Sequence, residues 1–242
     1  MHRRTGRIVA LKFISKSNIR SFDCLEQVKS EIEIHSRLQH RNIIECYGHY
    51  KDGENVVVIL EYANGGCLYN HKVARKFLSE EETSHYVREL ICALRYLHSY
   101  RIIHRDIKPE NILLHDGHIK LCDFGCATKL ENNSFKISLV GTLEYISLEL
   151  CNEQEYDEKI DIWSVGVLAY ELLTGDVPCK AATLEEMIVK VKSMKVESLH
   201  HPLISEDAYM FISSILVESS KRPSLQSMLK TSFIDKYSVD KQ

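Results

Sequence analysis

The stretch His104-Arg105-Asp106-Ile107-Lys108-Pro109-Glu110-Asn111 decides how the rest of this sequence is interpreted. Most of its side chains carry a charge or can ligate a cation, yet apolar residues lie on both sides, at 102–103 and at 112–114. Apolar strands that hold a polar loop between them are typical of a rigid scaffold that presents a reaction site. After a second short apolar segment comes Asp123-Phe124-Gly125, twelve residues beyond Asn111.

The two stretches together resemble the catalytic loop and the metal-binding loop of eukaryotic protein kinases, H-R-D-x-K-x-x-N followed by D-F-G. Phosphoryl transfer requires a carboxylate near the acceptor hydroxyl, cations on the transferring phosphate and ligands for magnesium. The resemblance implies that Asp106 orients the substrate hydroxyl and accepts its proton, and that Lys108 neutralises the γ-phosphate of ATP. It also implies that Asn111 and Asp123 hold Mg²⁺, because hard oxygen ligands suit a hard cation. A solvated polar turn would explain one motif, but not both in this order.

Length and composition exclude several other classes of protein. A chain of 242 residues with 44% hydrophobic residues is large enough for one domain, or for two small ones that share a cleft. Its net charge of −3 gives no electrostatic support for binding to nucleic acid or to a membrane surface. The eight cysteines lack metal-binding spacing, and only a short apolar run at residues 8–11 follows the basic N-terminus. We therefore expect no signal peptide, no membrane span and reduced thiols.

A lysine lies inside an apolar strand near the start of the chain. Residues 8–14 are typical of a strand, and Lys12 lies within it. A buried charge is unfavourable without a partner, and the next element offers one. Residues 21–38 have a helical pattern of apolar residues in which Glu31 shares the inward face with Val28. We predict a Lys12–Glu31 ion pair, which the kinase resemblance assigns to positioning the α- and β-phosphates.

Two further strands, at 43–50 and 56–60, lead into Glu61-Tyr62-Ala63-Asn64-Gly65-Gly66. A pair of glycines after a buried strand is a flexible joint, so we place the domain boundary between residues 61 and 62. By resemblance this joint is the kinase hinge, with Leu60 as gatekeeper and the backbone of Glu61 and Ala63 bound to adenine. The complete set of nucleotide-binding residues that the resemblance implies is Lys12, Glu61, Tyr62, Ala63, Glu110, Asn111, Leu113 and Asp123.

The remainder of the chain is predicted to be mainly helical. Ser79-Glu80-Glu81-Glu82 is a capping box that begins a long helix ending near residue 100. Asp116-Gly117 favours a tight hairpin that carries Asn111 at one end and Asp123 at the other. Residues 161–173 are apolar nearly all round, as in a helix at the centre of a domain. The residues with structural roles implied by the resemblance are His104, Arg105, Glu149, Asp161 and Arg222, with Asp161 bonded to the catalytic-loop backbone and Arg222 paired with Glu149.

A polar, poorly periodic loop at 127–139 contains the candidate regulatory site. Ser138 lies four residues before Thr142, beside Lys136 and within potential reach of Arg105. A phosphate on Ser138 would bridge these cations and order the loop. An unmodified loop serine is the alternative.

From Lys12 to Phe233 the chain resembles the Aurora family of serine/threonine kinases. The stretches that carry this resemblance are 31–36 (EIEIHS), 59–63 (ILEYA), 140–145 (VGTLEY) and 157–164 (DEKIDIWS). Lys108 matches the serine/threonine form of the catalytic loop, and Glu110 matches the acid that favours substrates with basic residues upstream of the target. The resemblance implies an α+β, bilobal kinase fold: a small β-rich lobe at 1–61, without its first two strands, and a larger helical lobe at 62–242.

Membership would also imply a monomeric catalytic chain that uses ATP and Mg²⁺ in chromosome segregation, spindle assembly and cytokinesis. An activator of the inner-centromere-protein type is expected on the small lobe. The expected locations are the nucleus and cytoplasm, at the spindle, kinetochore or centromere.

Several positions depart from the Aurora pattern. The chain begins almost at the third kinase strand, so no Gly-rich loop precedes Lys12. Ser147-Leu148-Glu149 stands for A-P-E, Cys126 stands where tryptophan is usual, and Ser30 stands for a helix arginine that would clamp a loop phosphate. Two hypotheses follow: an active kinase, supported by the intact catalytic residues, and a pseudokinase or scaffold with little turnover, because a missing lid weakens ATP binding and admits water.

Overall fold

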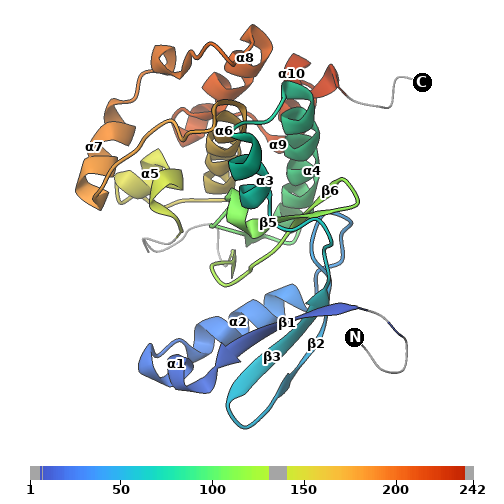
Figure 1. Ribbon diagram of the computed structural model, residues 1–242. Coiled ribbons are helices and arrows are strands. Elements are labelled where there is room, and N and C mark those ends of the chain that lie inside the picture. Colours follow the sequence, from blue (N-terminus) through green and yellow to red (C-terminus); the bar gives the residue numbers. More distant parts are fainter. Residues whose placement is uncertain (1–5, 7, 131–140, 238–242) are drawn as a thin grey trace.

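The chain folds into a small, sheet-rich lobe followed by a larger, helical lobe, as in the bilobal kinase fold predicted from the sequence (Figure 1). The computed structural model describes residue 6, residues 8–130 and residues 141–237. The last strand of the small lobe ends at Glu61, and the first helix of the large lobe begins at Leu68. The predicted boundary between residues 61 and 62 falls between these elements and stays a prediction.

An antiparallel sheet of three strands in the order β1-β3-β2 forms one layer of the small lobe. The strands are β1 Val9–Ser15, β2 Cys46–Lys51 and β3 Asn55–Glu61. The continuous apolar run of β3 suits its central position, and Val57 is fully buried there. The strand predicted from residue 43 begins later, because the backbone on both sides of Ile43 bonds to Leu121 of the large lobe instead. The Ile44 amide donates to the Leu121 carbonyl oxygen at 3.0 Å, and the Leu121 amide donates to the Asn42 carbonyl oxygen at 2.8 Å.

The helix predicted over 21–38 is shorter in the structure, where it is α2 Leu25–His35, and a separate helix, α1 Lys16–Ser21, precedes it. The chain reverses between them at Asp23, whose φ of 47° is incompatible with a continuous right-handed helix. The reversal lets Ile19 of α1 and Val28 of α2 share one small core with β3. Leu25, an apolar residue of the predicted helix, is exposed in the first turn of α2.

The large lobe is built around two long helices, α4 Glu80–Ser99 and α6 Lys159–Thr174, which pack against each other. The Ser79 hydroxyl accepts a hydrogen bond from the Glu82 amide at 3.2 Å, as the capping box predicts. Helix α6 is apolar and buried along most of its length and ends at Gly175. Gly175 has φ of 87°, and a Cβ there would lie 2.5 Å from the Lys76 carbonyl oxygen, so only glycine fits this helix end.

The large lobe also contains shorter helices and short strands. The helices are α3 Leu68–Arg75, α5 Leu148–Cys151, α7 Leu184–Ser193, α8 Glu206–Ile215, α9 Leu225–Met228 and α10 Ser232–Asp235. The strands are β4 Ile102–Ile103, β5 Ile112–His115, β6 His118–Leu121 and β7 Thr128–Lys129. Short 3-10 turns cover Pro109–Asn111, Leu143–Tyr145, Val196–Leu199 and Ser219–Lys221. Among the described residues, no helix combines the length and apolar character that a membrane span requires.

A buried ion pair fastens the last third of the chain to the segment that begins α5. The guanidinium of Arg222 donates to both carboxylate oxygens of Glu149, at 2.5 and 2.7 Å, and to the Lys159 carbonyl oxygen at 2.9 Å. Its guanidinium carbon also lies 4.9 Å from the centre of the Trp163 ring. The pair predicted from the sequence is therefore present, although leucine replaces the proline before Glu149. Because both side chains are almost completely buried, each depends on the other.

Removing one partner of this pair should destabilise the large lobe strongly. We expect Arg222→Met to lower the free energy of unfolding by about 3–5 kcal/mol, because the Glu149 carboxylate stays buried without its cation. Urea denaturation measures this change. Lys180→Met is the matched control, since Lys180 and its partner Asp176 are well exposed and such pairs contribute at most about 1 kcal/mol. Equal losses of unfolding free energy in the two variants would show that the buried Arg222–Glu149 pair does not stabilise the lobe as proposed.

Candidate active site

The β5–β6 hairpin positions both predicted metal ligands. The strands pair antiparallel from Ile112 with Leu121 to His115 with His118, and Asp116 and Gly117 turn the chain with φ values of 51° and 84°. These left-handed conformations are what an Asp-Gly turn supplies. At the open end of the hairpin the Cys122 amide donates to the Asn111 carbonyl oxygen at 2.9 Å. Asn111 therefore lies beside the residue that precedes Asp123.

Asp161 at the start of α6 fixes the backbone of the catalytic loop. Its carboxylate accepts hydrogen bonds from the amides of His104 and Arg105 at 3.0 and 2.9 Å, and from His98 Nε2 at 2.9 Å. Burial alone would raise the pKa of this carboxyl, but the hydrogen bond and charge of His98 and the charge of His104 hold the pKa below its ordinary value. The contact expected between Asp161 and the loop backbone is present.

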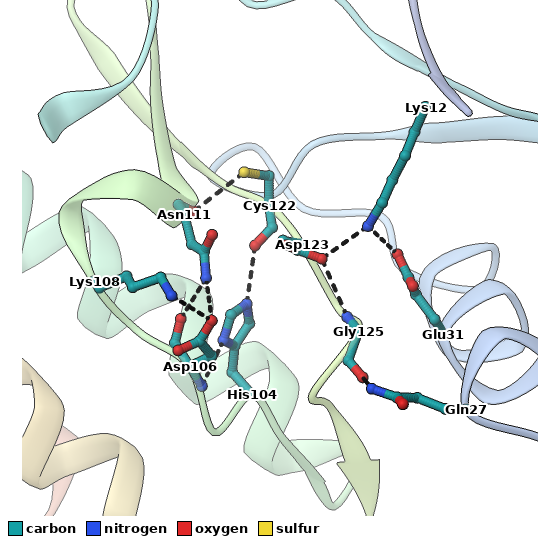
Figure 2. Close-up of polar contacts among 10 residues, drawn as sticks. All are labelled: Lys12, Gln27, Glu31, His104, Asp106, Lys108, Asn111, Cys122, Asp123 and Gly125. Atoms are coloured by element: carbon teal, nitrogen blue, oxygen red, sulfur yellow. Dashed lines mark hydrogen bonds and ion pairs between the residues drawn. The ribbon is translucent and has the colours of Figure 1, made fainter. Parts of the chain in front are cut away.

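Three side chains converge on Asp106. Asn111 Nδ2 donates to Asp106 Oδ2 at 2.7 Å, and Lys108 Nζ lies 3.0 Å from the same oxygen (Figure 2). The Thr142 hydroxyl donates to Asp106 Oδ1 at 2.8 Å and accepts from Lys108 Nζ at 2.7 Å. A carboxylate, an ammonium group and a hydroxyl thus meet within hydrogen-bonding distance, the spacing that general-base catalysis on a hydroxyl requires. Thr142 is a functional candidate that sequence reasoning missed.

The glycine before Thr142 explains how the loop reaches the carboxylate. Gly141 has φ of 98°, and a Cβ at this position would lie 2.6 Å from the Arg105 carbonyl oxygen. Any larger residue would push the loop away from the catalytic loop. The Gly-Thr pair in the 140–145 stretch was therefore a sequence signal for this contact.

Lys12 joins the small lobe to the hairpin. Its Nζ lies 2.6 Å from Glu31 Oε1 and 2.9 Å from Asp123 Oδ1, so the ammonium group stands between the two carboxylates (Figure 2). Burial alone would lower the pKa of Lys12, but the charge of Glu31 and hydrogen bonds to both acids raise it above its ordinary value. In the same way, burial of Asp123 is outweighed by its hydrogen bond to Lys12, and its pKa is lowered. The predicted Lys12–Glu31 pair is present.

The oxygens of Asn111 and Asp123 suit a hard divalent cation. Because Asn111 uses Nδ2 for its two bonds to Asp106, at 2.8 and 2.7 Å, its Oδ1 remains for a metal ion. Asp123 binds Lys12 and the Gly125 amide through Oδ1, which leaves Oδ2. A carboxylate oxygen and an amide oxygen are the donors that Mg²⁺ prefers. The predicted ligands therefore fit the ion by chemistry.

Comparison with known proteins agrees with this geometry. Residues 1–234 match the protein kinase domain family. An Aurora kinase of Encephalitozoon cuniculi is 40% identical over 246 residues, which cover 97% of this chain and 87% of the relative. The serine/threonine-protein kinase Aurora-2 of Arabidopsis thaliana is 37% identical over 96% of this chain and 82% of the relative.

The chain belongs to the Aurora family of serine/threonine protein kinases.

Aurora kinases of Schizosaccharomyces pombe and Candida glabrata are 42% and 39% identical to this Aurora-family chain. They match 97% and 93% of it, and the chain spans 66% and 63% of their own lengths.

The remaining predicted nucleotide-binding residues lie on both sides of the joint between the lobes. Glu61 binds Lys120 of the hairpin at 2.7 Å and the Glu45 amide at 3.1 Å through its side chain, so the end of β3 is fixed to both lobes. Ala63 and Leu113 are half-buried, whereas Tyr62 and Glu110 are exposed. Their contacts with adenine or ribose stay a prediction. Ser138, the predicted phosphorylation site, lies outside the described residues.

Two basic residues of the Aurora-family catalytic loop hold the metal-binding loop in place. His104 Nε2 lies 3.1 Å from the Cys122 carbonyl oxygen, and Arg105 Nε donates to the Cys126 carbonyl oxygen at 2.6 Å. Cys126, where tryptophan was expected, makes this contact through its backbone, so the substitution leaves it intact. Ser30 is exposed on α2 and forms no hydrogen bond to the metal-binding loop among the described residues, whereas Gln27 on the same helix donates to the Gly125 carbonyl oxygen at 2.8 Å.

His35 is a second residue that sequence reasoning missed. Its ring packs against the buried Phe124 of the metal-binding loop with centroids 4.6 Å apart, and its Nε2 lies 2.8 Å from the Ile44 carbonyl oxygen. Burial lowers the pKa of His35 to about 4, so the ring is neutral and Nε2 donates. Its position four residues after Glu31, on the same helix face, was the available signal.

The lowered pKa of His35 should make the Aurora-family fold acid-sensitive. Between pH 6.5 and 4 the unfolded chain binds a proton that folded His35 excludes, so stability is present above the unfolded pKa and is lost as pH falls. From pH 7 to pH 4.5 we expect wild type to lose about 2–3 kcal/mol more than His35→Gln, which keeps a donor for Ile44.

Urea denaturation at the two pH values measures this difference. His49→Gln, at an exposed histidine on β2, is the control and should keep the wild-type dependence. Identical pH dependence in wild type and His35→Gln would show that His35 is not held neutral.

Proposed function

We propose that this chain transfers the γ-phosphate of ATP to serine or threonine hydroxyls of protein substrates. The contact of Asp106 with both Lys108 and the Thr142 hydroxyl carries the proposal, because it places a base, a cation and a hydroxyl together. The Thr142 hydroxyl lies between the carboxylate and the ammonium group, which supports the proposal that a substrate hydroxyl binds there. Family membership supports the same reaction.

Each residue of the site then has a defined task. Asp106 orients the acceptor hydroxyl and takes its proton, while Lys108 holds positive charge beside the group in transfer. Lys12, kept charged by Glu31, presents its ammonium group toward the phosphates. When bound at Asn111 and Asp123, Mg²⁺ supplies charge that neutralises the phosphates. Since most of this catalysis is positioning and electrostatics, fixed side chains are what it requires.

We also propose that substrates carry basic residues near the target. Glu110 lines a surface hollow of about 270 Å³ together with Thr142 and Glu144. The other charges of the hollow compensate in two pairs, Lys72–Glu171 and Lys180–Asp176. Glu110 and Glu144 therefore set its net negative charge, which favours arginine or lysine in a bound peptide.

A protein activator of the inner-centromere-protein type is the partner we propose for the small lobe. A groove of about 720 Å³ lies between α1, α2 and the sheet, and its apolar lining includes Ile19, Val28 and Ile32. Its charged lining has more bases than acids: Lys16, Arg20, Lys29 and Lys51 against Asp23 and Glu33. This lining favours an apolar segment with acidic flanks. With such an activator the kinase would act as a monomeric catalytic chain in chromosome segregation, spindle assembly and cytokinesis. Its locations would be the nucleus and cytoplasm, at the spindle, kinetochore or centromere.

Loss of the Asp106 carboxylate should abolish transfer without unfolding the chain. We expect Asp106→Asn to lower kcat about 10²–10⁴-fold toward a peptide with arginines before its serine, because the amide cannot accept the proton. Phosphate incorporation from labelled ATP measures the rate. The matched control is Asp116→Asn in the hairpin turn, where an amide keeps the acceptor for Asn64 and activity should be unchanged.

The same assay separates the kinase from the scaffold hypothesis. Transfer by Asp106→Asn at the wild-type rate would remove this residue from the mechanism. Nucleotide binding by wild type without any transfer would favour the pseudokinase instead. Replacing the peptide arginines with glutamates should raise KM, and an unchanged KM would contradict the role of Glu110 and Glu144.

A further inference from the structure

A cluster of three potential metal ligands lies where α4 packs against β6, away from the contacts of the active site. His85 and Glu89 are four residues apart on α4 and so share one face of the helix, and His118 is the first residue of β6. One nitrogen of each histidine and one carboxylate oxygen all lie within 4.8 Å of one another. The catalytic and nucleotide-binding residues described above do not include any of the three.

The separations of these atoms are close to those of a tetrahedral metal site. His85 Nε2 lies 3.8 Å and His118 Nδ1 lies 2.6 Å from Glu89 Oε1. Zinc bonds of 2.0–2.1 Å at a tetrahedral angle place neighbouring ligand atoms about 3.3 Å apart. The two measured separations fall on either side of this value. Closing on an ion requires both histidines to move, and their side chains, 37% and 47% exposed, have room to do so.

Glu89 is held in the orientation that a metal ligand needs. The residue is buried, and its Oε2 accepts a hydrogen bond from the Ile119 amide at 2.8 Å. This bond fixes the carboxylate plane and leaves Oε1 directed at both histidines. Asn42 Nδ2 in turn donates to the Ile119 carbonyl oxygen at 3.1 Å. A carboxylate oriented by a backbone donor is the outer-shell arrangement common around protein metal sites.

One cation approaches the cluster. Arg41 Nη2 lies 4.0 Å from Glu89 Oε1, the limit of an ion pair, and its side chain is 72% exposed. A long exposed side chain at this distance contributes little and can turn into solvent. A metal ion would therefore displace Arg41 from the Glu89 carboxylate easily.

We propose that His85, Glu89 and His118 form a binding site for one divalent transition-metal ion, for which zinc is the best fit. Two imidazoles and one carboxylate are donors that zinc binds in proteins, with a fourth position left for water. Magnesium and calcium prefer oxygen donors only, so the histidines disfavour them. The alternative is that no ion binds there, and that the hydrogen bond between His118 and Glu89 only attaches the β5–β6 hairpin to α4.

The site links α4 to the hairpin whose ends carry Asn111 and Asp123. Since the three ligands come from two elements that meet only in the folded chain, the ion binds the native state and stabilises it. Zinc should therefore raise the melting temperature as well as bind. This consequence is independent of phosphoryl transfer.

The test is metal binding to chelator-stripped protein under reducing conditions. Titration calorimetry with zinc should give one site in wild type, weakened roughly tenfold or more in His85→Ala, His118→Ala and Glu89→Gln. Glu89→Gln keeps an acceptor for the Ile119 amide. His49→Ala, an exposed histidine on β2, is the control and should bind as wild type.

Cobalt(II) distinguishes this site from the eight cysteines. With cobalt(II) bound, we expect the visible absorption of a tetrahedral site without the ultraviolet charge-transfer band of thiolate ligands. Both histidine variants should lose this visible absorption. Equal zinc affinity in wild type and either histidine variant, no saturable zinc binding in wild type, or a thiolate band that survives in the variants would each overturn it. Circular dichroism of every variant checks that the fold is intact.

Discussion

The geometry of the site depends on the ion pairs that the Lys12 ammonium group forms. It brings together a strand and a helix of the small lobe and the metal-binding loop of the large lobe, through Glu31 and Asp123. A half-buried lysine is unfavourable alone, and so is the buried Glu31 carboxylate without the cation, whereas the half-exposed Asp123 depends on it less. The ammonium group contacts both acids, so it links β1, α2 and the hairpin in one arrangement. The raised pKa of Lys12 and the lowered pKa of Asp123 express this mutual dependence.

The catalytic loop is fixed independently, from the large lobe. Asp161 binds two successive amides of the loop, and Gly141 allows the segment that carries Thr142 to approach it. Contacts within the large lobe therefore fix the position of Asp106. The two systems meet at the β5–β6 hairpin, since Asn111 contacts Asp106 and Asp123 contacts Lys12. A rigid large lobe, and a small lobe joined to it by the Lys12 ion pairs and by contacts such as Glu61–Lys120, suit a reaction that depends on positioning.

Most of this arrangement could be predicted from the sequence, because motif spacing fixes it. A lysine in an apolar strand, an acid on the buried face of the next helix and an Asp-Gly turn each leave a local pattern. The break between α1 and α2 leaves none: Phe22 and Asp23 are not strong helix breakers, and the turn forms because both helices share a core with β3. Thr142, His35 and the cluster around Glu89 were missed for a related reason. Their contacts are tertiary, and only Gly141 and the spacing from Glu31 to His35 hinted at them.

A double-mutant cycle on Lys12 and Glu31 tests the central claim most directly. The free-energy changes in kcat/KM for ATP are measured for Lys12→Met, Glu31→Gln and the double variant. If the two side chains act as one unit, the double variant should be little worse than Lys12→Met, with a coupling energy of about 1–3 kcal/mol. Additive losses would show that Glu31 does not act through Lys12, and would contradict the account.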